Sequence, residues 1–157
     1  MATEIERKFL VKDEGWRRDA GEGKRIRQGY LSGGGTSSVR VRTSGGRAEL
    51  NIKSATLGVW RREYEYAIPL ADAEEMLDHL CDGPLIEKTR YHVEHAGHRW
   101  DVDVFEGDNA GLVVAEIELE SEDEAFTPPP WAGDEVSHDP RYYNVCLVTH
   151  PYKEWKD

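Results

Sequence analysis

The chain has 157 residues, of which 38% are hydrophobic and 32% charged, a balance typical of a folded globular domain. Its 31 aspartates and glutamates outnumber its 20 lysines and arginines, so the formal net charge is −11. This charge argues against a general nucleic-acid binder or a protein that binds anionic membranes, but it leaves a small anionic substrate open because local placement of the basic residues decides binding.

Short segments that alternate apolar and charged side chains follow one another along the chain, as expected of β-strands with two different faces. Turn-forming residues separate them, for example Gly45-Gly46 and Ala96-Gly97. Many short strands with hairpin spacing predict a mainly β (α+β) fold, arranged as an antiparallel sandwich or barrel. The strands are expected at residues 3–11, 25–31, 37–43, 47–53, 60–68, 85–95, 98–105 and 112–120.

Two helices are expected between and after these strands. One covers residues 70–81, where Met76, Leu77 and Leu80 share a face. The other begins near Asp139-Pro140, a capping residue followed by proline at the first helical position. The acidic, proline-rich stretch at 121–130 is interpreted as a surface excursion. No linker separates parts of the chain, so we expect one domain over residues 1–157.

Nearly every expected strand carries a row of charged side chains on one face. The rows are sorted by sign, and they comprise Glu4, Glu6 and Lys8; Arg40 and Arg42; Lys53; Glu63 and Glu65; Lys88 and Arg90; Asp101 and Asp103; and Glu116, Glu118 and Glu120. For a single strand, the simplest interpretation is a charged face turned to solvent. Repetition on almost all strands favours a barrel whose water-filled interior collects these rows around an ion or an anion, since burial without such a ligand would be costly.

The two kinds of row indicate a chemistry. Carboxylates supply the oxygen ligands that Mg²⁺ prefers, alongside phosphate oxygens of a substrate. Arginines and lysines suit a chain of phosphates, and Arg27 on the second strand is a further candidate. Acids and bases in one cavity would bind metal and polyphosphate together, which is the arrangement required for phosphoryl transfer to water.

These residues also resemble a known family, the CYTH or triphosphate tunnel metalloenzyme superfamily. Glu4, Glu6 and Lys8 within EIERKFL match its ExExK signature, and the rest of the chain follows the family pattern in order. The further matching segments are RQGYL at 27–31, VRVR at 39–42, LNIKS at 50–54, REYEY at 62–66, EKTRY at 87–91, DVDVFEG at 101–107, AEIELE at 115–120 and PRYYN at 140–144. The chain is most similar to the short bacterial stand-alone members.

The resemblance implies an eight-stranded antiparallel β-barrel that forms a charged tunnel, with a few peripheral helices. It implies that Mg²⁺ or Mn²⁺ is held by Glu4, Glu6, Glu116 and Glu118. It implies that the triphosphate contacts Lys8, Arg40, Arg42, Lys53, Lys88 and Arg90. The remaining tunnel acids, which would balance charge or support a second metal, are Glu63, Glu65, Asp101 and Asp103.

The expected reaction is hydrolysis of inorganic tripolyphosphate to pyrophosphate and phosphate. Lys8 and Tyr30 are the candidates for activating or orienting the attacking water. Other activities of the superfamily stay open, namely class IV adenylyl cyclase and nucleoside or thiamine triphosphatase, because a fold does not fix a substrate. A non-catalytic polyphosphate or nucleotide sensor is a third alternative. Such a sensor would not need metal-binding acids, whereas the pairs Glu4/Glu6 and Glu116/Glu118 are both present.

The cellular setting is inferred from what the sequence lacks. The N-terminal residues include no apolar run of signal-peptide length, and no stretch approaches the eighteen or so apolar residues that span a membrane. Cys81 and Cys146 are far apart and form no CxxC pattern, so a disulfide framework is not expected. We expect a cytoplasmic enzyme without nucleic-acid or membrane partners; the sequence leaves a homodimer open.

Overall fold

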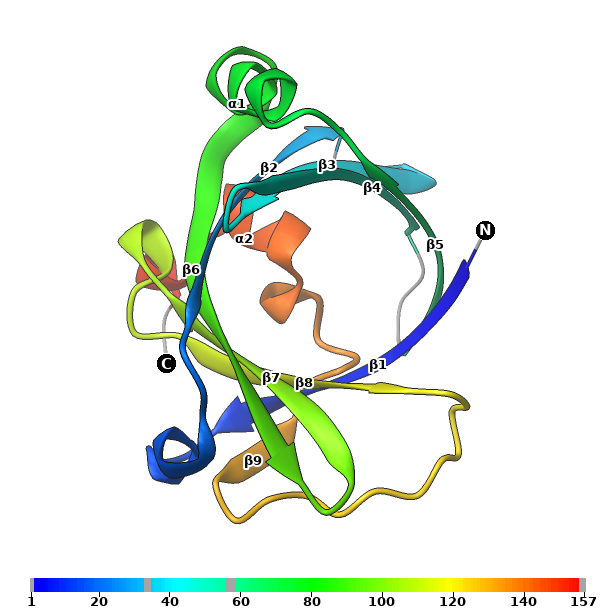
Figure 1. The fold of residues 1–157 in the computed structure, drawn as a ribbon, viewed down its shortest axis with the longest axis vertical. Helices are drawn as coiled ribbons and strands as arrows, with labels where there is room; N and C mark the ends of the chain where they lie inside the picture. Colours follow the sequence, from blue (N-terminus) through cyan, green and yellow to red (C-terminus); the bar gives the residue numbers. More distant parts are fainter. Residues whose placement is uncertain (1, 33–34, 56–58, 156–157) are drawn as a thin grey trace.

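The computed structural model describes residues 2–32, 35–55 and 59–155. Its strands form one antiparallel sheet in the order β5-β4-β3-β2-β6-β7-β8-β1-β9, and β5 also pairs with β1, which closes a ring of eight strands (Figure 1). The ring consists of β1 (Ala2–Val11), β2 (Lys24–Ser32), β3 (Ser37–Ser44), β4 (Arg47–Ser54), β5 (Trp60–Ala67), β6 (Asp82–His95), β7 (His98–Phe105) and β8 (Val113–Leu119). The expected eight-stranded antiparallel barrel is confirmed.

A ninth strand was not predicted from the sequence. β9 (Ala132–Glu135) pairs with the end of β1, where Phe9 lies opposite Glu135 and Val11 opposite Ala132. It has only four residues, Ala-Gly-Asp-Glu, and none of the alternation that marks the other strands. This strand therefore forms because it can pair with a free edge of β1, and not because its residues have a high β-propensity.

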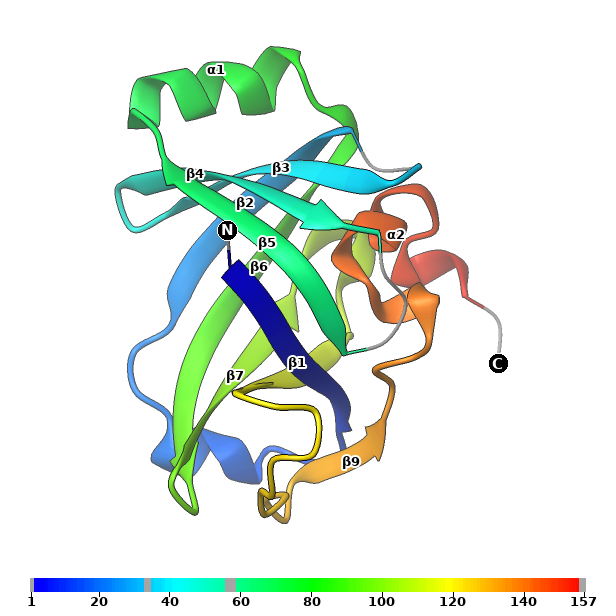
Figure 2. The ribbon, with the colours of Figure 1, turned by 90° about the vertical axis from the view of Figure 1, so that its right-hand side faces the viewer.

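The first helix supports the barrel from outside. α1 (Leu70–His79) ends two residues earlier than expected, and it buries Ala73 and Leu77 against Val41 and Ala48 of β3 and β4. Figure 2 shows the helix lying across these strands, away from the barrel interior. Its role is therefore to cover an apolar patch on the barrel wall.

The second helix begins later than the sequence predicted. A short 3₁₀ turn, η3 (Pro140–Tyr142), follows Asp139, whose side chain accepts a hydrogen bond from the Arg141 backbone N–H. Tyr143 is then extended, with φ −72° and ψ 133°, and α2 (Asn144–Thr149) begins after it. The prediction of a helix from Asp139 was wrong in this respect, because the extended residue interrupts the helical backbone. The other 3₁₀ turns are η1 (Gly15–Asp19), η2 (Gly107–Asn109) and η4 (Tyr152–Glu154).

The largest apolar core lies on the outer side of the barrel wall. Trp100, Val102 and Ile117 are fully buried there, and they pack with Trp16 and Trp131 from outside the eight-stranded ring. The excursion at 121–130 contributes to this covering, because Phe126 packs against Phe9 and Trp100 with ring centroids 5.9 Å apart in each case. Apolar residues thus stabilise much of the wall from outside, and polar groups line its inner face except at the end where Phe105, opposite Lys88, joins a second apolar cluster.

The C-terminal segment closes one end of the barrel. Leu147 and Val148 of α2 join a second apolar cluster with Ile86 and Phe105 of the wall. Figures 1 and 2 together show α2 at one end of the ring, with the β3–β4 hairpin at the other end. Among the helices that the structure describes, none is long and apolar enough to cross a membrane.

Candidate active site

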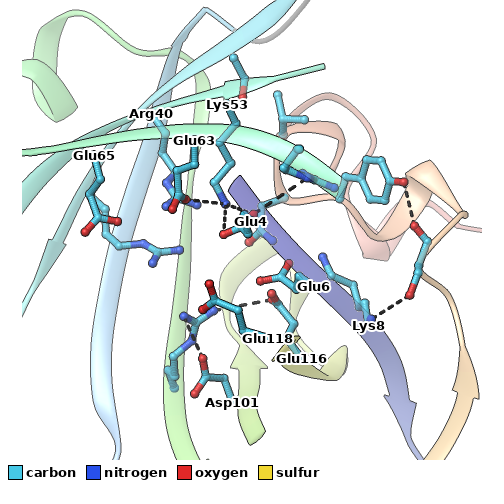
Figure 3. A pocket seen from close by; sticks show the side chains of 18 of the residues that line it. Glu4, Glu6, Lys8, Arg40, Lys53, Glu63, Glu65, Asp101, Glu116 and Glu118 are labelled. Atoms are coloured by element: carbon cyan, nitrogen blue, oxygen red, sulfur yellow. Dashed lines mark hydrogen bonds and ion pairs between the residues drawn. The ribbon is translucent and has the colours of Figure 1, made fainter. Parts of the chain in front are cut away.

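The barrel interior contains a polar cavity of about 210 Å³. Every strand of the ring contributes to it, and the side chains drawn in Figure 3 converge on it from opposite walls. The charged residues that line it are Glu4, Glu6, Lys8, Arg40, Arg42, Lys53, Arg61, Glu63, Glu65, Lys88, Arg90, Arg99, Asp101, Glu116 and Glu118. Tyr30, Ser38, Ser137, Tyr143, Asn144 and Val145 complete the lining.

Strand register brings residues far apart in sequence to the same place. β1 and β8 are paired so that Glu6 lies opposite Glu118 and Lys8 lies opposite Glu116. On the other side of β8, Asp101 of β7 lies opposite Glu116. Because paired residues on one face of a sheet are about 4.5–5.5 Å apart, these acids form one continuous patch on the inner wall.

The acidic patch is crowded with carboxylates. Burial, together with the nearby carboxylates of Glu116 and Glu4, raises the pKa of Glu6 well above its ordinary value. Burial alone would also raise the pKa of Glu116, but Lys8, a hydrogen bond with Glu6 and the Arg90 guanidinium hold it well below its ordinary value. The Glu6 carboxyl is therefore the protonated partner and donates to Glu116. A proton shared between two carboxylates occupies a position that a cation also favours.

The donor set suits a hard divalent cation. Glu4, Glu6, Glu116 and Glu118 offer only carboxylate oxygens, which is the ligand type of Mg²⁺ and Mn²⁺. Within the described ranges, no three acidic, histidine or cysteine side chains already enclose an ion-sized space. Mg²⁺ takes a few carboxylates and completes its coordination with substrate and water oxygens, so the chemistry of these four carboxylates suits it.

The opposite wall is crowded with cations. Arg40 is 7% exposed, and its Nε atom has no hydrogen-bond partner in the part of the chain that the structure describes. Burial and the neighbouring guanidiniums of Arg40 and Arg90 lower the pKa of Arg42 to about 9. Burial also lowers the pKa of Lys88 to about 7, despite the attraction of Asp103. Cations held this close together favour a polyanion between them.

Two ion-pair groups fix the side chains between these walls. Lys53 Nζ lies 3.1 Å from Glu4 Oε1 and 3.4 Å from Glu63 Oε2, which joins β1, β4 and β5. Asp103 is fully buried, with Lys88 Nζ at 2.7 Å and Arg90 Nε also at 2.7 Å. The burial of Asp103 would raise its pKa, but Arg90 and Lys88 lower it to about 2. The Asp103 carboxylate therefore stays ionised and anchors two cations of the opposite wall.

The structure gathers most of the residues that the sequence singled out. All of the expected metal ligands and substrate contacts line the cavity except Arg27, as do Tyr30 and the acids Glu63, Glu65 and Asp101. Arg27 lies on the outer face of β2, where its Nε is 3.5 Å from Glu87 Oε1, so its place beside the phosphates must be corrected. Asp103 is not a lining residue, because Lys88 and Arg90 cover it.

Several lining residues were missed by the sequence reasoning. Arg61 shares a strand face with Glu63, and Arg99 shares one with Asp101, so alternation alone was sufficient to find both. Gln28 does not line the cavity, but it is fully buried, shares the face of Tyr30 and contacts Arg42, so it was accessible to the same argument. Tyr143 and Asn144 come from the C-terminal segment, and no strand periodicity points to them.

Comparison with known proteins agrees with this geometry. A family model described as a CYTH domain matches residues 2–143. The chain is 46% identical over 157 residues to a protein of Acetivibrio thermocellus named inorganic triphosphatase, and the match covers 100% of both chains. It is 41% identical over 152 residues to an inorganic triphosphatase of Nitrosomonas europaea, which covers 93% of this chain and 97% of the relative.

Solved structures show the same relationship. The crystal structure of the inorganic triphosphatase NE1496 superposes with a TM-score of 0.67 at 38% identity, covering 94% of this chain and 95% of the other. A putative adenylyl cyclase from Hippeastrum, described as having a dominant triphosphatase activity, has a TM-score of 0.61 at 15% identity, covering 75% and 80% of the two chains, and shares the fold alone. With the motif order, the closed barrel and these matches in agreement, the chain belongs to the CYTH domain family.

Proposed function

We propose that this protein hydrolyses a linear triphosphate, inorganic tripolyphosphate to pyrophosphate and phosphate, with Mg²⁺ or Mn²⁺. One observation carries the proposal: a single cavity holds a surplus of carboxylates on one wall and a surplus of cations on the other. Burial and acidic neighbours raise the pKa of Glu6, and burial and basic neighbours lower the pKa of Arg42 to about 9. Ion pairs such as Lys53 with Glu4 offset part of this charge, but carboxylates stay crowded around Glu6 and cations around Arg42, so a cation and a polyanion bound together would relieve both groups.

The residues divide into two sets by charge. We assign the metal to Glu4, Glu6, Glu116 and Glu118, and a bound divalent cation would polarise phosphate oxygens and offset their charge. The phosphates would contact the basic residues of the cavity, namely Lys8, Arg40, Arg42, Lys53, Lys88 and Arg90. Arg40 is the strongest candidate among them, since its buried Nε has no acceptor among the residues that the structure describes. The curated relatives named inorganic triphosphatase support tripolyphosphate as the substrate.

The attacking water needs an orienting group or a proton acceptor. Tyr30 lines the cavity and is 6% exposed, and we propose that its hydroxyl orients the water. Lys8 Nζ donates to the Tyr142 carbonyl at 3.0 Å, which holds Lys8 on the wall as a substrate-binding cation.

The alternative activities lack a supporting feature. An adenylyl cyclase or a thiamine triphosphatase needs an organic pocket beside the phosphates, whereas the lining of this cavity is almost entirely charged or polar. A sensor without catalysis would not need the crowded acids around Glu6. We place the enzyme in the cytoplasm and expect no nucleic-acid or membrane partner, in keeping with its net charge of −11.

The test is phosphate release from tripolyphosphate, ATP and pyrophosphate, measured side by side with Mg²⁺, Mn²⁺ or EDTA. We expect strong metal-dependent release from tripolyphosphate and little from ATP or pyrophosphate. Preferential release from ATP would assign the protein to nucleoside triphosphates. Tight binding of tripolyphosphate without any release would assign it to the sensor class.

A further inference from the structure

One side chain in the cavity comes from outside the barrel strands and contacts the basic wall. Asn144 is the first residue of α2, in the segment that closes one end of the barrel. Its Oδ1 atom lies 2.9 Å from Lys88 Nζ and 3.1 Å from Gln28 Nε2. Both partners are fully buried. A single amide oxygen therefore connects the C-terminal segment to two wall strands, β2 and β6.

The directions of these hydrogen bonds follow from the chemistry of the groups. The Nε of Arg42 can only donate, and it lies 2.8 Å from Gln28 Oε1, so this Gln28 atom must be the acceptor. The amide nitrogen of Gln28 must then face Asn144, which makes the Asn144 oxygen the acceptor of its N–H. Lys88 Nζ donates to that same oxygen. The orientation of both amides is thus fixed by an arginine that has no acceptor capacity.

The amide oxygen completes the support of Lys88. Asp103 Oδ2 lies 2.7 Å from Lys88 Nζ, and Asn144 Oδ1 is the second oxygen contacting this ammonium. Without Asn144, Asp103 would be its only oxygen partner among the described residues. Phe105 lies under the ammonium at 5.2 Å from the ring centroid and offers no comparable hydrogen bond.

The same contact joins separate cations into one network. Hydrogen bonds through Gln28 and Asn144 connect Arg42 to Lys88. Ion pairs with Asp103 connect Lys88 to Arg90. The charged groups that face Lys88 come from three other strands of the barrel and from β6 itself. They are Arg42 on β3, Arg90 on β6, Asp103 on β7 and Glu116 on β8.

We propose that Asn144 is a positioning residue, which holds the Lys88 ammonium in place for the phosphate chain through its amide oxygen. The inference rests on the proposed function, because Lys88 matters here as a substrate contact. The geometry gives the closing segment a part in substrate binding that goes beyond blocking one end of the barrel. It acts through Lys88, and not through contact with the phosphates.

A double-mutant cycle on binding tests this assignment. The four proteins are the unaltered chain, Asn144→Leu, Lys88→Met and the double variant, and the probe is inorganic tripolyphosphate in EDTA, titrated by calorimetry. Asn144→Leu keeps the side-chain shape and removes the acceptor, so we expect Kd to rise roughly ten- to hundredfold, as for a lost hydrogen bond to a charged group. In the Lys88→Met background the same change should alter Kd by less than about twofold.

Two further variants separate positioning from folding. Thr149→Val removes the contact of its hydroxyl with the Cys146 carbonyl, 3.5 Å away in the same helix, and should leave Kd unchanged. Asn144→Asp keeps an acceptor oxygen and the side-chain shape, so it tests the pair even where Asn144→Leu does not fold. Its carboxylate is neutralised by Lys88, and we expect it to weaken binding far more in the Lys88→Met background, where it faces the phosphates unpaired.

The outcomes distinguish the inference from the function that it rests on. An unchanged Kd in Lys88→Met, or no binding by the unaltered protein, would count against the proposed substrate contacts themselves. A second outcome would overturn the positioning role alone. In that case Lys88→Met weakens tripolyphosphate binding, but either Asn144 substitution changes Kd by the same factor in the Lys88→Met protein as in the unaltered chain. Loss of binding in Thr149→Val would show that the helix acts only through its fold.

Discussion

The protonation of Lys88 leads to the prediction that the protein takes up a proton when the substrate binds. Burial is the main reason why the pKa of its ammonium falls from an ordinary 10.5 to about 7. The attraction of Asp103 opposes this shift, and the repulsion of Arg90 and Arg42 adds to it. At about 1.36 kcal/mol per pH unit, this corresponds to roughly 5 kcal/mol of lost preference for the charged form. A triphosphate in the cavity should restore that preference, so the protein is expected to take up a proton as the substrate binds.

The size of the uptake follows from the pKa. One unit charge about 4 Å away, at an effective dielectric constant of about 20, stabilises the ammonium by roughly 4 kcal/mol. A chain of several phosphate charges would therefore keep Lys88 protonated throughout the neutral range. With a free pKa of about 7, the uptake should be roughly 0.1 proton at pH 6, 0.5 at pH 7 and 0.9 at pH 8.

Calorimetry measures this uptake directly. Tripolyphosphate is titrated into the protein in EDTA, at each pH in buffers with different ionisation enthalpies, and the slope of the observed enthalpy against buffer enthalpy gives the number of protons. The Lys88→Met protein corrects for protons exchanged by other groups and by the phosphate itself. The difference between the two proteins should rise from about 0.1 to about 0.9 proton between pH 6 and pH 8.

The reasoning fails if this difference stays near zero at pH 8. In that case, Lys88 would already carry its proton in the free protein, and the anchoring carboxylate of Asp103 would outweigh burial. Denaturant unfolding of the two proteins at several pH values checks the sign of the effect on stability. Because the folded protein holds the Lys88 proton less tightly than the unfolded chain does, the contribution of Lys88 should raise the free energy of unfolding as the pH increases from about 7 toward 10.5.

Three further substitutions test the two walls and the water. Glu6→Gln should abolish metal-dependent turnover. It should also raise the melting temperature in EDTA at pH 7, because the raised pKa of Glu6 means that its contribution to stability is lost as the pH rises through that pKa. A lower melting temperature would contradict the proton shared between Glu6 and Glu116. Arg42→Ala should weaken tripolyphosphate binding by about 1.5–3 kcal/mol, roughly 10- to 150-fold in Kd, through a lost charge-assisted contact, and an unchanged Kd would place the phosphates elsewhere. Tyr30→Phe should lower kcat with little change in Kd, whereas unchanged turnover would remove the hydroxyl from the mechanism.

The strand pattern was readable from the sequence because strand periodicity is local. Side chains alternate with a period of two, so Glu4, Glu6 and Lys8 had to share a face wherever that strand lay. The same reasoning sorted Lys88 with Arg90 and Glu116 with Glu118, and the structure turns all of these inward. The helix expected at 70–81 was visible too, since apolar residues repeat at helical spacing, but it ends at His79, and Leu80 of the predicted apolar face is exposed beyond that end.

Alternation does not say which face of a strand turns inward. In β2, Gln28 and Tyr30 face the interior and Arg27 faces out, although Arg27 carries the charge that suggests a phosphate contact. The choice depends on closing the ring through β1 and β5 and on the apolar groups that cover the outer wall. Both involve residues distant along the chain, so no window of sequence contains the answer.

The sequence by itself determined the eight strands of the ring, the segregation of charge by sign and the ExExK pattern that identifies the family. Only the tertiary structure decided the position of the C-terminal segment, where a 3₁₀ turn and the extended Tyr143 precede α2 and bring Asn144 to Lys88. These two residues are 56 positions apart. Their contact depends on how Leu147 and Val148 pack into the end of the barrel, a long-range packing preference that local periodicity does not encode.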